Sequence, residues 1–455
     1  MSSGLPPQKE PPALDTTRKW FPVAGRVCVL VLAARLAVQT AQTAGTVVAW
    51  GDNDSLQTSV PPSATNTVAI AGGSSHSLAL QHNGMVVGWG DNSFGEAASP
   101  GLSNVVALAA GNGFSLALQN NGAVFVWGSQ TNAPVSSTNV VAIAASLDNA
   151  MALTENGSVT AWGAGPAPPA NATNLVAIAA GNTHSLALAG DGTVLAWGDP
   201  TLGKTAVPAG LTDVVALAAG EYHSLALRGD GTVVAWGDDT WGQTNVPIGL
   251  SNVVAIAAGA FHNLALKQDG TVAVWGDNSY GQTNLPIGLT NVSGIAAGRY
   301  HNLAILGDGS PVITVQPISQ YDPATQSATF RVMVVGRSPL SYQWQQDGVN
   351  IAGATNSTLV LTNFSTPAAG VYSVIISNSL GVATSAGVQL PPAWRLPPCQ
   401  APVITSVLTA AGKQGGAFSY AIVATHQPIF YSASGLPAGL TVNPTNGVIK
   451  GALLE

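Results

Sequence analysis

The chain has 455 residues, a formal net charge of −7 and a charged fraction of only 8%. Disordered chains combine high charge with low hydrophobicity, so the 46% of hydrophobic residues indicates folded domains, and this length favours two or three of them. The sequence contains no cluster of Lys or Arg, and we therefore expect no non-specific nucleic-acid binding, which requires basic residues against the phosphates.

Residues 1–44 are predicted to be a signal peptide or leader. A polar, Pro-rich stretch ends in basic residues, and a short apolar run from Val27 to Ala34 follows. A basic flank, a short apolar segment and small residues after it are typical of a secretory signal, so we expect a secreted or cell-surface protein. The apolar run is shorter than the about 20 residues of a membrane-spanning helix, and we expect no membrane span in the mature chain. Because Arg35 interrupts the pattern, an unstructured leader or a misassigned start codon is the alternative.

Residues 45–310 contain a unit that occurs seven times. The dipeptide Trp-Gly returns after steps of 39, 38, 35, 35, 39 and 39 residues, in phase with an Ala-rich segment and a Leu-Ala-Leu segment. Each unit has three short apolar runs, and Asn-Gly or Asp-Gly between the second and third is a strong hairpin signal. The unit is therefore predicted to be a three-stranded antiparallel sheet, and seven sheets that bury one another's faces form a β-propeller. The recurring tryptophans are Trp50, Trp89, Trp127, Trp162, Trp197, Trp236 and Trp275.

The two ends of the array predict how the ring closes. The repeat begins at Thr46–Gly51 with a third strand and ends at His301–Ile305 with a second strand. We expect the N-terminal strand to complete the last blade, because this pairing removes two exposed sheet edges. An open solenoid with ragged ends is the alternative.

The recurring pattern Ala-Ala-Gly-x-x-His-Ser-Leu-Ala-Leu, followed by Asp-Gly-Thr-Val-Val-Ala-Trp-Gly-Asp, resembles the regulator of chromosome condensation repeat. The short blades are similar to the bacterial branch of that family, which includes β-lactamase inhibitory protein II. The resemblance covers about residues 46–309 and implies a propeller. Because the family includes a nucleotide exchange factor and an enzyme inhibitor, it also implies a domain that presents loops to another protein and carries out no chemistry of its own.

Two sets of loops are predicted to share one end of the propeller, one before the recurring His and one after Trp-Gly. Both sets carry aromatic residues, which protein interfaces favour. We therefore predict a binding surface at this end, richest on the last three blades. The alternative is that the rings fill gaps between blades. The candidate residues are Phe94, Tyr222, Trp241, Phe261, Tyr280 and Tyr300.

Two patterns suggest metal sites but have simpler explanations. The recurring histidines lie one blade apart, whereas zinc ligands must converge within about 2.1 Å of one ion, so we expect each imidazole to bond local backbone. Asp238–Gly242 and Asp277–Gly281 resemble calcium loops but lack the closing Glu of an EF-hand, and turn chemistry explains them. We predict no metal, cofactor or catalytic residue. The histidines are His76, His184, His223, His262 and His301.

Residues 311–390 are predicted to form an immunoglobulin-like sandwich. Trp344 fits the core Trp of the third strand, and Tyr372 fits the tyrosine corner. Val332 and Val374 stand where the family often has its two cysteines, so apolar packing is expected in place of the disulfide. The predicted fold is therefore all-β: a seven-bladed propeller with three-stranded blades, followed by a sandwich.

The last two segments are a Pro-rich linker, residues 391–401, and residues 402–455. The latter resemble the immunoglobulin-like or cadherin-like modules of bacterial surface proteins but are short of the about 100 residues of a full sandwich. A second, partial module is therefore expected.

These features favour a monomeric, non-enzymatic protein that is secreted or held at the cell surface and that binds or adheres to a protein or a glycan through its propeller loops. The alternative is an enzyme inhibitor or a guanine-nucleotide-exchange-like regulator that acts through the same face. A polysaccharide-active enzyme is a third hypothesis. It has the weakest basis, because paired catalytic carboxylates and Ser/His/Asp sets are not recognisable in the sequence.

Overall fold

The computed structural model describes most of residues 45–390 and three short strands near the C-terminus. The predicted leader and the predicted linker lie outside the described residues, as does most of the predicted C-terminal module. The described residues are 45–98, 100–129, 139–190, 192–322, 327–362, 369–390, 417–421, 440–442 and 448–452.

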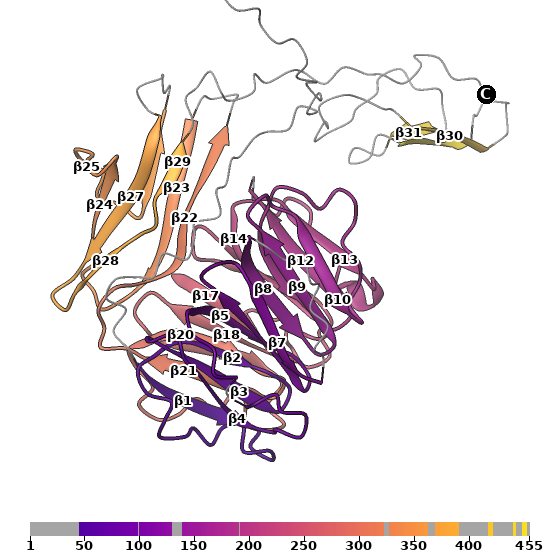
Figure 1. Ribbon diagram of the computed structural model, residues 1–455. Helices are drawn as coiled ribbons and strands as arrows, with labels where there is room; N and C mark the ends of the chain where they lie inside the picture. Colours follow the sequence, from indigo (N-terminus) through magenta and orange to yellow (C-terminus); the bar gives the residue numbers. More distant parts are fainter. Residues whose placement is uncertain are drawn as a thin grey trace, which may run out of the picture. The chain divides into compact units, whose positions relative to one another are not determined.

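Seven three-stranded antiparallel sheets follow one another and form the blades of a propeller, as predicted (Figure 1). They are numbered here from blade 1 to blade 7 in chain order. The strands are β2 (Thr67–Gly72), β3 (His76–Gln81) and β4 (Val86–Gly90); β5 (Val105–Ala110), β6 (Phe114–Gln119) and β7 (Val124–Gly128); β8 (Val140–Ser146), β9 (Asn149–Thr154) and β10 (Val159–Gly163); β11 (Leu175–Ala180), β12 (His184–Ala189) and β13 (Val194–Gly198); β14 (Val214–Ala219), β15 (His223–Arg228) and β16 (Val233–Gly237); β17 (Val253–Ala258), β18 (His262–Lys267) and β19 (Val272–Gly276); and β20 (Val292–Ala297), β21 (His301–Leu306) and β1 (Thr46–Gly51).

The ring is closed by an exchanged strand. β1 pairs antiparallel with β21, with Trp50 opposite Asn302, and the two strands lie side by side in Figure 1. A backbone hydrogen bond of 3.0 Å from Asp52 to Tyr300 extends this pairing, and another of 3.1 Å joins Arg299 of blade 7 to Gly73 of blade 1. The predicted closure is therefore confirmed, and the open solenoid is excluded.

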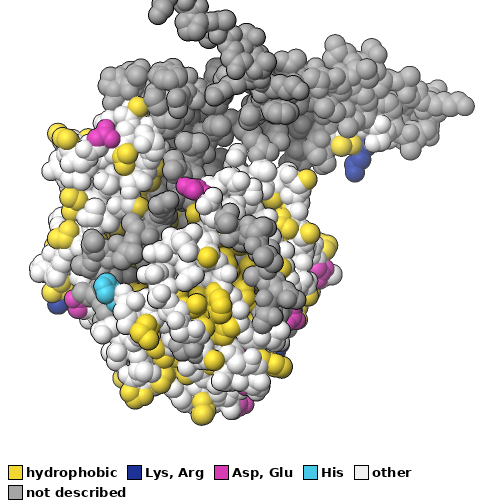
Figure 2. Space-filling view, in the orientation of Figure 1, with side chains coloured by type: hydrophobic (Ala, Val, Ile, Leu, Met, Phe, Trp, Pro, Cys, Tyr) yellow, Lys and Arg dark blue, Asp and Glu magenta, His cyan; other side chains and the backbone are white. Residues whose placement is uncertain are grey.

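The middle strand of every blade is the most buried one. In all seven blades its first five residues are buried, because the strand has a partner on both sides and a neighbouring blade against each face. The first strands end in small residues that surround the propeller axis, where the blades converge. Figure 2 shows hydrophobic side chains gathered over the propeller and few charged ones in this view. The alanines at the axis are Ala110, Ala145, Ala180, Ala219, Ala258 and Ala297.

A side-chain latch joins each blade to the next. The His76 Nε2 atom of blade 1 lies 2.8 Å from Ser115 Oγ of blade 2, and the His223 Nε2 atom lies 2.6 Å from Asn263 Oδ1. The expectation that each imidazole bonds local backbone was wrong, because the partner is a side chain on the adjacent blade. The corresponding pairs at other junctions are His184–Ser224, His262–Asn302 and His301–Ser77, and Asn149–Ser185 takes this place after blade 3.

The latch ends on a carbonyl group that two donors share. Ser77 Oγ donates to the Gln57 carbonyl at 2.8 Å, and the Trp89 indole N–H donates to the same oxygen at 2.8 Å. Because the only proton of the Ser77 hydroxyl is used there, the 2.9 Å bond to His301 requires the proton on its Nε2. The recurring His, Ser and Trp therefore form one network with the loop that contains Gln57.

The rest of the motif follows from this latch. A Cβ atom on Gly220 would lie 2.5 Å from His223 Nδ1 and closer still to Cε1 of the same ring, so the Gly that stands three residues before the His cannot carry a side chain. At the junction between blades 2 and 3, Phe114 replaces the His and Ala150 replaces its Ser or Asn partner. Both are fully buried in one apolar cluster. This junction therefore substitutes apolar packing for a hydrogen bond.

Residues 312–390 form two further sheets around a separate core. Trp344, Tyr372, Val332 and Val374 are buried in that core, where the sequence placed them, and the Phe330 ring stacks on Tyr372 at 4.6 Å. An immunoglobulin-like assignment stays a prediction. The strands are β22 (Val312–Asp322), β23 (Ser327–Val335) and β26 (Thr358–Leu361) in one sheet, and β24 (Ser341–Gln346), β25 (Val349–Asn350), β27 (Gly370–Ser377), β28 (Val382–Thr384) and β29 (Val388–Leu390) in the other.

Near the C-terminus, three strands form one antiparallel sheet in the order β30-β32-β31. Their bounds are Ala417–Ala421 for β30, Leu440–Val442 for β31 and Val448–Ala452 for β32. The rest of the predicted partial module lies outside the described residues, so its completeness stays untested.

The sheets of residues 312–390 contact one end of blades 5 and 6. Thr314 Oγ1 donates to the Val254 carbonyl at 2.6 Å, and the Gly336 N–H donates to the Gln268 carbonyl at 3.0 Å. An ion pair joins Arg331 to the loop before β14. All three contacts lie at the hairpin end of the blades, which is the end away from the latches.

We expect the propeller to lose stability in acid because of its latch histidines. Burial lowers the pKa of His184, His223 and His262 to about 4 and that of His301 to about 3, so the folded state keeps them neutral. Between about pH 6.5 and pH 4 the unfolded chain binds more protons, and the free energy of unfolding falls as the pH falls through that window. The expected loss is roughly 3 kcal/mol for each His. Urea unfolding between pH 4 and pH 8 measures it.

The variant His184→Asn is a matched control, because Asn149 already makes this latch to a Ser at 3.0 Å. It should weaken the pH dependence while the latch is retained. A wild-type stability that stays constant from pH 7 to pH 4 would contradict the assignment of neutral, buried histidines.

Removal of β1 is expected to open the ring. A chain that begins at residue 52 lacks the buried Trp50 and Val47 side chains and leaves β21 with an unpaired edge. Loss of two buried side chains costs about 4 kcal/mol, and exposed edges favour association. Thermal unfolding and light scattering should show a lower melting temperature and oligomers, relative to a chain that begins at residue 45. Equal melting temperatures and two monomers would exclude closure by this strand.

Candidate protein-binding face

The turns between first and second strands and the loops after third strands lie at the same end of the propeller. This follows from strand pairing, since Gly72 lies opposite Ser77 beside the first turn, and His76 lies opposite Gly90 where the loop after β4 begins. We call this end the loop face. It is the end opposite the hairpins that contact residues 312–390.

The loops after Trp-Gly have a fixed internal structure, which blade 5 shows clearly. Asp238 Oδ1 accepts hydrogen bonds from the backbone N–H and the hydroxyl of Thr240, at 3.3 and 2.6 Å. Gln243 Oε1 accepts the Trp241 N–H at 2.8 Å, and Gln243 Nε2 donates to Asp238 Oδ2 at 2.8 Å. Both carboxylate oxygens of Asp238 therefore accept hydrogen bonds within the turn.

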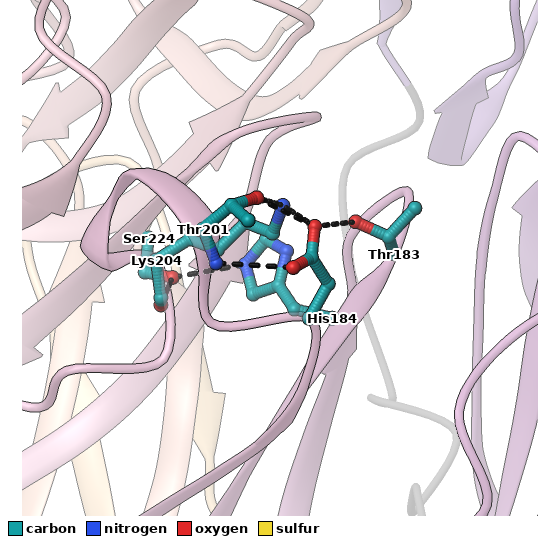
Figure 3. A network of polar contacts seen from close by, with 6 residues as sticks. Thr183, His184, Thr201, Lys204 and Ser224 are labelled. Carbon is teal, nitrogen blue, oxygen red and sulfur yellow. Dashed lines mark hydrogen bonds and ion pairs between the residues drawn. The ribbon is translucent and has the colours of Figure 1, made fainter.

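The same arrangement recurs in other blades. The Gln57 and Gln282 side chains donate to Asp52 and Asp277 at 2.8 Å. In blade 4 the position is held by a buried Lys, Lys204, which Figure 3 shows beside Thr201. Its ammonium group lies 2.6 Å from Asp199 Oδ2. This ammonium group, together with Thr201, holds the Asp199 carboxyl ionised and its pKa well below the ordinary value.

A fixed loop directs its middle side chain to solvent. The exposed fractions are 64% for Phe94, 56% for Leu202, 52% for Trp241 and 49% for Tyr280. Large apolar groups with this exposure have no role in the core. Because the backbone beneath them is held by side-chain hydrogen bonds, little conformational entropy is lost when a partner binds them.

Next to these loops, aromatic side chains from the turns before the His form a row. The rings of Tyr222 and Phe261 stack with centroids 5.5 Å apart, and the rings of Phe261 and Tyr300 stack at 6.5 Å. Tyr280 joins the row through Tyr300 at 4.9 Å. Four residues from three consecutive blades thus form one aromatic surface, which we call the aromatic row.

An ion pair lies beside the aromatic row at the propeller axis. Glu221 is 5% exposed and accepts a 2.7 Å hydrogen bond from Arg299 Nε, while the Arg299 side chain is 41% exposed. The guanidinium group also lies 5.2 Å from the centroid of the Tyr300 ring. The neighbouring Glu221 carboxylate contributes to a raised pKa of Arg299. The pair therefore holds a guanidinium group between an aromatic ring and a carboxylate.

The structure brings together four of the six predicted residues, Tyr222, Phe261, Tyr280 and Tyr300. Trp241 and Phe94 lie on the same face but, within the described residues, take no part in these ring contacts. Tyr222, Phe261 and Tyr300 are half-buried and stack on one another. Sequence reasoning missed Leu202, Glu221 and Arg299, although the phase of the repeat marks all three positions.

Across the ranges that the structure describes, no group of three or more His, Cys, Asp or Glu side chains is placed to hold a metal ion. In the same ranges, no helix is long and apolar enough to cross a membrane.

Replacement of Glu96 by Gln is expected to stabilise blade 2. Glu96 occupies the Gln position of its loop and accepts the Phe94 N–H at 2.8 Å, but it offers no N–H to the Asp91 carboxylate. E96Q supplies that donor, and one such bond contributes about 1 kcal/mol. Calorimetry should show a melting temperature about 3 °C higher. The reverse change, Gln243→Glu, should lower it. A fall with E96Q would show that this buried carboxylate has another role.

Comparison with known proteins agrees with this architecture. The family model for the regulator of chromosome condensation (RCC1) repeat matches residues 68–96, 105–133, 175–204, 214–243 and 253–282, which are blades 1, 2, 4, 5 and 6. Blade 3 has the altered latch residues, and blade 7 is divided between the two ends of the array. A search of the curated proteins found no match.

Two of the similar solved structures are of yeast Prp20. The structure of Prp20p from Saccharomyces cerevisiae has 20% identity and a TM-score of 0.51, and the match covers 58% of this chain and 92% of that one. The structure of Kap60 bound to yeast RCC1 (Prp20) has 20% identity and a TM-score of 0.52, with 65% and 97% covered. At this identity the likeness shows the fold alone. With the five matched repeats, it identifies the seven blades as an RCC1-like repeat propeller.

Proposed function

We propose that this chain is a non-enzymatic, protein-binding protein and that its loop face on blades 5–7 contacts the partner. The observation that carries the proposal is the aromatic row beside the exposed Trp241, on loops that side-chain hydrogen bonds hold in place. Tyr and Trp are enriched among the residues that contribute most to binding energy at protein interfaces. Rigid presentation lowers the entropic cost of using them.

The opposite end of the same blades supports this choice of face. There, Thr314, Gly336 and Arg331 bond to blades 5 and 6, and Val254 is buried with Val312 in one cluster. That end is therefore occupied by the chain's own sheets. The loop face of these blades remains as a surface for a partner.

The relatives support a protein as the partner. Prp20p binds Gsp1p and histones, and yeast Prp20 has been solved with Kap60 bound to it. For this chain, the predicted leader and the sheets after the propeller favour a secreted or cell-surface protein in binding or adhesion.

The experiment is affinity capture with the full chain and with the triple variant W241A/Y280A/Y300A. The variant should retain at most a tenth of the captured partner, because it removes two exposed rings and the half-buried Tyr300 ring while the backbone bonds of the loops remain. Partners are taken from the culture medium and the cell-surface fraction and are quantified by mass spectrometry.

The matched control is M85A/V360A, which removes two hydrophobic side chains that are 49% and 54% exposed elsewhere. It should capture the partner as the wild type does. Undiminished capture by the triple variant, with its fold verified by circular dichroism, would refute the proposed face.

A further inference from the structure

The loop face carries an excess of negative charge. Ten acidic and two basic residues lie in its turns and loops, in a chain with few charges overall. Such a cluster raises the local concentration of cationic partners and selects against acidic ones. The acidic residues are Asp52, Asp54, Asp91, Glu96, Asp148, Asp199, Glu221, Asp238, Asp239 and Asp277, and the basic ones are Lys204 and Arg299.

Both basic residues are already paired within the face. Lys204 binds Asp199 at 2.6 Å, and Arg299 binds Glu221 at 2.7 Å. Among the described residues, no other ion pair is formed at this end of the propeller. No described Lys or Arg side chain therefore neutralises the remaining carboxylates.

One of these carboxylates, Asp239, is not required by the loop that carries it. Its Oδ1 accepts the Thr244 N–H at 2.9 Å. Three other blades have an Asn at this position, and the Asn278 Oδ1 accepts the Thr283 N–H at the same 2.9 Å. An amide is therefore sufficient for the turn, and the negative charge of Asp239 has no structural function in it. The other two such residues are Asn53 and Asn92.

Asp239 stands two residues before Trp241 in the same loop, and both side chains are exposed. A carboxylate beside an aromatic ring suits an Arg or Lys side chain, which gains a charge-assisted hydrogen bond and a cation–π contact together. The Arg299 guanidinium group shows this combination elsewhere on the face, bonded to Glu221 and 5.2 Å from the Tyr300 ring.

We propose that Asp239 and Trp241 form a recognition site for an Arg or Lys side chain of the partner, so that the loop face selects a protein with a basic surface. This inference rests on the proposed function, because it names the partner chemistry of the same face. The aromatic row supplies apolar contact area, and Asp239 supplies the preference for positive charge.

The test uses the full chain, immobilised, and a random nine-residue peptide library displayed on phage. Peptides selected by the wild type should be enriched in Arg and Lys, and D239N should remove that enrichment. D230N is the matched control. D230N removes the same charge from a hairpin of the same blade. An Asn is compatible with that turn, because Asn121 accepts the equivalent hydrogen bond in blade 2. D230N should select the same basic peptides as the wild type.

Fluorescence anisotropy then measures the affinity of the best peptide and that of a counterpart in which citrulline replaces Arg. Binding should weaken about tenfold for the citrulline peptide and for D239N, and added salt should weaken the wild-type complex more than the D239N complex. Selection of neutral or acidic peptides, failure to select any, or equal affinities for the wild type and D239N would overturn the cation site. If W241A/Y280A/Y300A still removes binding of neutral peptides, the proposed binding face stands and this inference alone fails.

Discussion

In most blades, the hydrogen bonds that join one blade to the next end on a single backbone carbonyl group in the loop after the third strand. In blade 5 this is the Gln243 carbonyl, which accepts the Trp275 indole N–H at 3.1 Å and the Asn263 side chain at 2.8 Å. Asn263 Oδ1 in turn accepts a hydrogen bond from His223 Nε2 of the preceding blade. A buried hydrogen bond of this kind is costly to leave unmade. The contact between blades, the position of the Trp side chain and the position of the loop therefore depend on the same hydrogen bonds.

Gln243 contributes to the propeller framework through its backbone and to the proposed binding surface through its side chain. The backbone oxygen of Gln243 serves the junction between blades, whereas its side chain holds Asp238 and the N–H of Trp241. The residue between these anchors is free to vary, and it is Phe94, Leu202, Trp241 or Tyr280 in different blades. A fold of this type can change what it binds at one position without change to the network beneath it. The proposed function therefore rests on that surface and not on the propeller fold as such.

Charge has a similar division of roles. Most Asp residues of the loop face occur where a turn requires an acceptor, and their carboxylates bond to nearby N–H and hydroxyl groups. These residues would be present whatever the partner. Asp239 differs because an Asn performs its turn function in three other blades. Internal repetition thus provides the comparison that separates a structural carboxylate from one available for recognition.

The repeat itself determined the strands, the number of blades and the exchanged N-terminal strand. This was possible because strand alternation, Asp-Gly turns and Trp-Gly ends are local signals that occur seven times in phase. The position of the candidate aromatics on one face also followed, since strand direction alone fixes the end at which each loop lies.

Contacts between blades were decided only by the tertiary structure. Sequence reasoning assigned each latch His to local backbone, because it had no means to place Ser115 beside His76 across the junction. For the same reason it could not distinguish the stacked Tyr222 and Phe261 from the solvent-directed Trp241, or pair Glu221 with Arg299 two blades away. The periodic sequence pattern predicts the structure within one blade. Which side chains are buried or paired between blades depends on how far each blade is rotated against its neighbours.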